Sequence, residues 1–152
     1  VEWLIENLAL NKKWCLVHCT QMLDYESRLL AETGAVIGLC PITEANLGDG
    51  VFNGEKWLNE GGKFGIGTDS NVKISLFEEI RTLEYSQRLK YGKRIVLKQN
   101  NSGSIGRDLI ESITLIKCNA PPSIKSSLST LVITTCSKFN CLTDSAILIA
   151  SP

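Results

Sequence analysis

Three short runs of apolar residues in the first half of the chain limit its fold more than any other feature. They occupy residues 14–19, 35–40 and 63–69, and stretches with the apolar spacing of helices lie between them. Runs of this length and composition are typical of strands that are buried on both faces. Strands that alternate with helices predict an α/β fold with a parallel sheet. In such sheets the functional groups lie at the carboxyl ends of the strands.

Helix signals flank each of these runs. Residues 1–8 carry apolar side chains at helical spacing, and Asp24 can cap a helix that runs to residue 33 and ends at Gly34. The strongest signal is Ser75 with Glu78 three residues later, which is a capping box for a helix that ends near Gly92. We also expect a short helical turn at residues 55–59 and a helix at residues 105–116, whereas the Gly- and Asn-rich residues 43–54 predict a loop.

Composition excludes several functions. The chain has 152 residues with 16 basic and 16 acidic side chains, so it lacks the net positive charge of a nucleic-acid or membrane-surface binder. No apolar run reaches the roughly 20 residues that a membrane helix needs. Three of the six cysteines, Cys15, Cys19 and Cys40, lie in the apolar runs, which favours buried, reduced thiols and a cytoplasmic protein.

Two polar residues end predicted strands. His18, the only histidine, ends the first run, and Asp69 ends the third. A catalytic or metal-binding role suits both positions, but a lone histidine can also be a structural residue, and an aspartate at a strand end can simply form a turn. The polar residues Glu44, Asn46 and Asp49 of the predicted loop are candidates for substrate contacts, with a plain glycine-rich turn as the alternative.

Several stretches together resemble one known family. Residues 14–20 (Trp-Cys-Leu-Val-His-Cys-Thr), 38–50 (ending in Thr-Glu-Ala-Asn-Leu-Gly-Asp-Gly), 65–72 (Gly-Ile-Gly-Thr-Asp-Ser-Asn-Val) and 78–89 are similar to the formimidoylglutamate deiminases of the amidohydrolase superfamily. The resemblance covers residues 1–117. The Thr-Glu-Ala-Asn-Leu-Gly-Asp-Gly motif is specific to these deiminases, whereas the strand-end histidine and Thr-Asp-Ser are shared more widely in the superfamily, including guanine and cytosine deaminases.

The resemblance implies a partial (β/α)₈ barrel. Residues 1–117 would supply strands six to eight with their helices, and the amino-terminal half of the barrel would be a missing partner. Both outer strands would then have unpaired edges. Residues 118–152 do not continue the resemblance, so we expect an irregular tail, and a shifted reading frame, divergence and disorder are the explanations left open.

The resemblance also implies a reaction. It is the zinc-dependent hydrolysis of the formimino group of N-formimino-L-glutamate, a small molecule, to N-formylglutamate and ammonia in histidine degradation. Asp69 would bind the zinc and help move the proton, and His18 would hydrogen-bond the attacking water or the tetrahedral centre. Zinc would activate that water.

The remaining zinc ligands of the family are histidines, and His18 is the only one in this chain. We therefore expect no tight zinc binding and no turnover from this chain alone, because a catalytic zinc usually takes three protein ligands. The alternatives are another deaminase of the superfamily, of the guanine or cytosine type, and a non-catalytic interaction fragment. A homo-oligomer is compatible with each of them.

Overall fold

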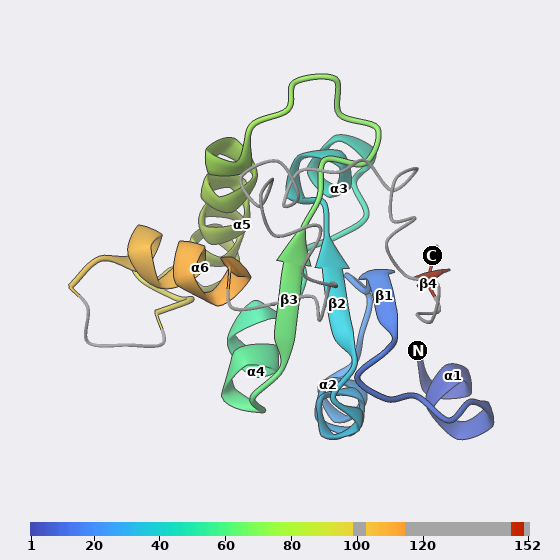
Figure 1. Ribbon diagram of the computed structural model, residues 1–152. Coiled ribbons are helices and arrows are strands. Elements are labelled where there is room, and N and C mark those ends of the chain that lie inside the picture. Colours follow the sequence, from blue (N-terminus) through green and yellow to red (C-terminus); the bar gives the residue numbers. More distant parts are fainter. Residues whose placement is uncertain (99–102, 115–146, 151–152) are drawn as a thin grey trace, which may run out of the picture.

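The computed structural model describes residues 1–98, 103–114 and 147–150, which form a sheet with helices around it (Figure 1). In chain order the elements are α1 (Glu2–Asn7), β1 (Cys15–His18), α2 (Asp24–Thr33), β2 (Val36–Leu39), α3 (Pro41–Leu47), α4 (Gly54–Asn59), β3 (Lys63–Ile66), α5 (Leu76–Tyr91), α6 (Ile105–Thr114) and β4 (Ile147–Ala150). None of the helices within these residues combines the length and apolar character that crossing a membrane requires.

The sheet is parallel throughout the described strands, in the order β3-β2-β1-β4. Leu16 of β1 is paired with Ile37 of β2, which in turn is paired with Phe64 of β3. Because the strands are parallel, their carboxyl ends lie at the same edge of the sheet. The helix α3 lies beside that edge, whereas α2 and α4 lie toward the opposite end (Figure 1).

The core forms between the sheet and its helices. Trp57 of α4 is fully buried and its ring meets that of Phe52 edge-on, with 6.4 Å between the ring centroids. A Cβ atom at Gly62 would lie 2.2 Å from the Trp57 ring, so only glycine fits there without movement. The other large contributors are apolar residues of the strands and of α2, α5 and α6: Leu16, Leu30, Ile37, Leu39, Phe64, Ile80, Leu83, Leu109 and Ile113.

The signals at Ser75, Gly34 and Gly92 are confirmed in the structure, whereas the prediction that Asp24 caps α2 is wrong. The Ser75 hydroxyl accepts a hydrogen bond from the Glu78 backbone N–H at 3.4 Å, and α5 begins at the next residue. Gly34 and Gly92 follow α2 and α5 with φ angles of 76° and 61°, in the left-handed region that glycine adopts without strain. The helix α2 begins at Asp24 itself, so this residue is the first helical position and Leu23 precedes it as the cap.

Two predictions about irregular segments are wrong. Residues 43–54 are not a single loop, because α3 extends to Leu47 and α4 begins at Gly54. Pro41 stands at the first turn of α3, where its missing N–H costs no helical hydrogen bond. Most of the predicted irregular tail, residues 118–146 and 151–152, lies outside the described residues, but its described part, Ile147–Ala150, forms β4 and pairs with β1. The outer edge of β1, which was expected to be unpaired, therefore pairs with β4.

Candidate functional site

The backbone is unusual where β1 and β3 end. His18, Cys19 and Asp69 have φ angles of 70°, 51° and 46°, and they are the non-glycine residues with positive φ in the described part of the chain. Such conformations cost about 1–3 kcal/mol each and persist only where the surrounding structure enforces them. Such conformations concentrate at functional sites. His18 is the last residue of β1 as predicted, whereas β3 ends at Ile66 and Asp69 lies three residues beyond it, in the turn that follows.

The two residues lie close together although 51 positions separate them in sequence. His18 Nε2 is 3.9 Å from Asp69 Oδ2, and their side chains are 15% and 33% exposed. This distance exceeds that of a direct hydrogen bond. A water molecule or a substrate atom between the two groups could contact both of them. The partial exposure leaves the pair accessible from the carboxyl edge of the sheet.

The other ring nitrogen of His18 contacts a buried carboxylate. His18 Nδ1 is 3.1 Å from Glu44 Oε1, and the side chain of Glu44 is 6% exposed. The same oxygen accepts a hydrogen bond from the Cys40 backbone N–H at 2.8 Å. The hydrogen bond to Glu44 raises the pKa of His18, burial of the ring opposes this, and the negative charges of Glu44, Asp69 and Asp49 add to the increase.

Polar contacts also join the segments that follow β2 and β3. The Thr43 hydroxyl donates to the Thr68 carbonyl at 3.0 Å. Glu79 of α5 is fully buried, and it accepts hydrogen bonds from the Ile42 backbone N–H at 2.9 Å and from the Asn71 side chain at 3.4 Å. Burial raises the pKa of Glu79. These contacts fix the start of α3 relative to the turn that carries Asp69.

The three candidates for substrate contacts occupy different environments. Glu44 is buried against His18, whereas Asn46 is exposed on α3. The backbone carbonyl of Asp49 accepts hydrogen bonds from the Thr20 hydroxyl at 2.7 Å and the Gln21 side-chain amide at 2.6 Å. The structure thus joins Glu44 directly to the His18–Asp69 pair, and it ties the backbone of Asp49 to the segment that follows β1.

Sequence analysis missed Glu79 and Thr43 as supports of the site. Both act through partners that are distant in sequence, with 37 positions between Glu79 and Ile42 and 25 between Thr43 and Thr68. The available signal for Glu79 was its position beside Ile80 and one turn before Leu83, two apolar residues of the buried helix face. A carboxylate is tolerated there because the segment after β2 supplies a hydrogen-bond donor. No local pattern indicates that donor.

The described residues do not by themselves fit a zinc site. They contain no cluster of three or more histidine, cysteine, aspartate or glutamate side chains that could hold a metal ion. His18 and Asp69 offer two donors at one place, and a catalytic zinc usually takes three protein ligands. A complete metal site would therefore need donors in addition to those described.

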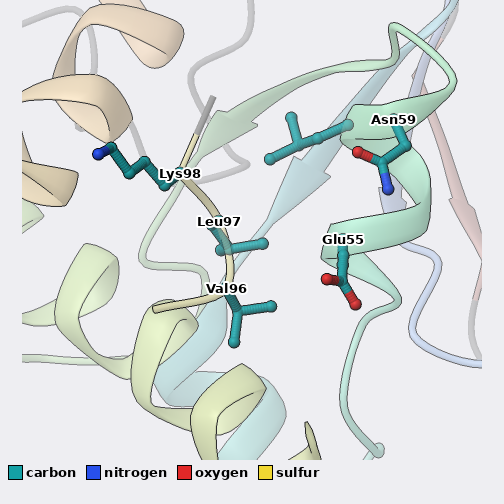
Figure 2. Close-up of a pocket in the computed structure, with 6 residues that line it drawn as sticks. Glu55, Asn59, Val96, Leu97 and Lys98 are labelled. Carbon is teal, nitrogen blue, oxygen red and sulfur yellow. The ribbon is translucent and has the colours of Figure 1, made fainter. Parts of the chain in front are cut away.

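Two surface pockets are lined by neither His18, Glu44 nor Asp69. One of about 270 Å³ lies between α4 and the segment after α5 (Figure 2), and its lining residues are Glu55, Leu58, Asn59, Val96, Leu97 and Lys98. Another of about 470 Å³ lies beside the segment that follows β1 and is lined by Thr20, Gln21, Met22, Leu23, Gly50, Val51 and Lys90. We place the candidate site where β1 and β3 end, because His18, Glu44 and Asp69 come together there, and the second pocket borders it through Thr20 and Gln21.

Known proteins are similar to this chain over most of its length. Residues 1–115 match the model of the amidohydrolase family. The chain is 48% identical over 112 residues to the formimidoylglutamate deiminase of Pseudomonas aeruginosa, which covers 74% of this chain and 25% of the relative. It is 30% identical over 101 residues to the 5'-deoxyadenosine deaminase of Methanothrix thermoacetophila, covering 64% of this chain and 24% of that relative. The resemblance seen in the sequence is thereby confirmed.

Solved structures show the same relationship. An amidohydrolase from Brucella melitensis superposes with a TM-score of 0.72 at 52% identity, covering 74% of this chain and 25% of that one. An adenosine deaminase from Xanthomonas campestris with bound zinc superposes with a TM-score of 0.55 at 27% identity, covering 59% of this chain and 21% of that one. The chain spans about a quarter of the length of these relatives. The family match, the parallel α/β architecture and the two similar folds together show that this chain belongs to the amidohydrolase family.

Proposed function

We propose that this chain forms part of the active site of a deaminase that hydrolyses the formimino group of N-formimino-L-glutamate, giving N-formylglutamate and ammonia. Residues 1–117 would contribute strands six to eight of a (β/α)₈ barrel, as β1, β2 and β3. The remaining strands and the other metal ligands would come from the amino-terminal half of the barrel. The proximity of His18 Nε2 and Asp69 Oδ2, at 3.9 Å, is the observation that carries this proposal.

The two side chains suit the proton movements that this hydrolysis requires. Water adds to the formimino carbon, a C–O bond forms, and the C–N bond to the departing ammonia breaks. The water must give up both of its protons, and the formimino nitrogen must gain two to leave as ammonia. In our proposal the Asp69 carboxylate transfers these protons one after the other: it takes one from the attacking water and passes it to the nitrogen as the C–O bond forms, then takes the second from the hydroxyl of the tetrahedral centre and passes it to the same nitrogen as the C–N bond breaks. His18 Nε2 forms a hydrogen bond to the same water or to the tetrahedral centre.

Sequence similarity favours the formimino substrate. Identity to the formimidoylglutamate deiminase is 48%, against 30% to the 5'-deoxyadenosine deaminase. Residues 43–50, which resemble the deiminase motif, begin within α3 and contribute Glu44 to the site. An adenosine-type substrate is the second candidate, because several similar relatives are deaminases of that class.

A chimeric enzyme tests the proposal. The matched residues of this chain replace the corresponding segment of the Pseudomonas aeruginosa deiminase, and ammonia release is measured from N-formimino-L-glutamate and from 5'-deoxyadenosine. We expect activity on the formimino substrate, a loss of at least about 100-fold on His18→Asn or Asp69→Asn, and little change on the exposed control Arg81→Ala. A zinc-loaded chimera that hydrolyses only the nucleoside, or neither substrate, would refute the proposal.

The chain alone gives a second test. Because His18 and Asp69 supply two donors, we expect calorimetric titration of the 152-residue chain with zinc to show only weak binding. Asp69→Asn serves as the matched variant. Stoichiometric binding that is tight and lost on Asp69→Asn would contradict our proposal that additional ligands come from another part of the barrel.

A further inference from the structure

Glu44 is the carboxylate that contacts Nδ1 of His18, the ring nitrogen that faces away from Asp69. It lies on α3, beside the carboxyl edge of the sheet (Figure 1), and its side chain reaches the imidazole of His18 at the end of β1. The residue is 4% exposed, so water does not compete freely for its oxygens. Its contact with a side chain 26 positions earlier therefore depends on how β1 and α3 pack.

One oxygen of Glu44 is held from two directions. Oε1 accepts the Cys40 backbone N–H at 2.8 Å and lies 3.1 Å from His18 Nδ1. Cys40 is the residue immediately before α3, so its N–H donor gives the oxygen a fixed location relative to the backbone. Glu44 Oε1 is consequently held in place by the Cys40 N–H and can act as a fixed acceptor for the imidazole of His18.

An ionised carboxylate only accepts hydrogen bonds, so the short contact requires a hydrogen on Nδ1. In the neutral ring, one nitrogen carries the hydrogen and the other offers a lone pair. With Nδ1 as the donor to Glu44, the lone pair belongs to Nε2, the nitrogen that is 3.9 Å from Asp69 Oδ2. The hydrogen bond made by one ring nitrogen thus sets the state of the other.

We propose that Glu44 is a positioning residue for His18: its carboxylate, anchored on the Cys40 N–H, fixes the orientation of the ring and the Nδ1–H tautomer, so that Nε2 points to the reacting atoms beside Asp69. This inference rests on the proposed function for its catalytic meaning, since it extends the roles given there to His18 and Asp69. It assigns Glu44 to the imidazole and not to direct contact with the substrate.

Because the chain has a single histidine, ¹⁵N resonances of labelled histidine report on His18 alone. The spectrum of the 152-residue chain is recorded in mildly alkaline solution, where the ring is neutral and the two tautomers have distinct shifts. We expect the Nδ1–H tautomer in the unmodified chain and its loss in Glu44→Ala. Glu44→Gln should largely restore it, because the amide oxygen can still accept from Nδ1. Glu84→Gln, which changes a buried carboxylate remote from His18, is the matched control.

The unmodified chain can overturn the inference by itself, so it does not depend on how well the variants fold. A dominant Nε2–H tautomer, or an Nδ1–H tautomer that persists in folded Glu44→Ala, would do so. In the chimera described above, Glu44→Ala should lower kcat roughly 10–100-fold with a smaller change in KM, and Glu44→Gln should recover part of the loss. If the tautomer results hold but the chimera does not hydrolyse the formimino substrate, the proposed function fails and the positioning role stands.

Discussion

Replacing Glu84 by alanine should destabilise the fold strongly although the residue is remote from the candidate site. Glu84 of α5 is 3% exposed. Its Oε1 accepts hydrogen bonds from Arg88 Nε at 2.8 Å and from the Val96 backbone N–H at 3.2 Å, and its Oε2 accepts from the Leu97 backbone N–H at 3.1 Å. One carboxylate therefore attaches the segment after α5 to the helix.

The magnitude follows from the groups that the substitution leaves unpaired. Val96 and Leu97 are both buried, and a buried N–H without a partner costs about 1–3 kcal/mol. Glu84→Ala leaves two such groups, so we expect a loss of about 2–6 kcal/mol in the free energy of unfolding. Glu84→Gln keeps one acceptor oxygen and places an NH₂ group against one of the two N–H groups, so the expected loss is about 1–3 kcal/mol.

Urea unfolding followed by tryptophan fluorescence measures these differences. The matched control is Glu55→Ala, because Glu55 forms an ion pair with Lys93 at 3.0 Å that is largely exposed. Exposed pairs of this kind contribute about 0.2–1 kcal/mol. We expect Glu55→Ala to be the most stable of the three variants, Glu84→Gln to be intermediate and Glu84→Ala to be the least stable. If the two alanine variants unfold at the same urea concentration with the same slope, the reasoning about buried N–H groups is refuted.

Three further predictions concern other parts of the chain. Gly62→Ala should lower stability by about 1–3 kcal/mol, because its Cβ would overlap the buried Trp57 ring, and an unchanged thermal midpoint would contradict the packing argument. Burial raises the pKa of Cys19 to about 12, so iodoacetamide at neutral pH should label this thiol only after denaturation, as peptide mass mapping would show, and rapid labelling of the native chain would oppose this. Deleting residues 147–152 should expose the outer edge of β1 and increase self-association in size-exclusion chromatography, whereas an unaltered elution volume would argue against pairing by β4.

The sequence predicted those elements that carry strong local signals. Ser75 and Gly92 mark the ends of α5, and Gly34 marks the end of α2, because capping depends on residues that are adjacent in sequence. The placement of His18 and Asp69 at strand ends followed from the apolar runs before them. Parallel pairing then brought the two residues to one edge of the sheet.

The missed elements depend on distant partners or on very short patterns. A helix of seven residues is too short for a clear apolar period, so α3 was taken for a loop, although Pro41 at its start and Gly48 after its end fit the usual asymmetry of helix termini. The strand β4 is defined by pairing with β1, more than 120 positions earlier, and no local signal reveals such a partner. The contact of Glu44 with His18 depended on the same kind of long-range packing.

The strained backbone at the strand ends links the fold to the candidate chemistry. Positive φ angles are unfavourable for residues other than glycine. Tertiary contacts must therefore hold the backbone at His18, Cys19 and Asp69. The described contacts are suited to this, because Glu44 holds the His18 ring and Thr43 holds the carbonyl of Thr68, the residue before Asp69. Both supports come from α3. The helix that sequence analysis missed is therefore the element that sets the geometry of the two residues that it found, and weakening the start of α3 should disturb both of them together.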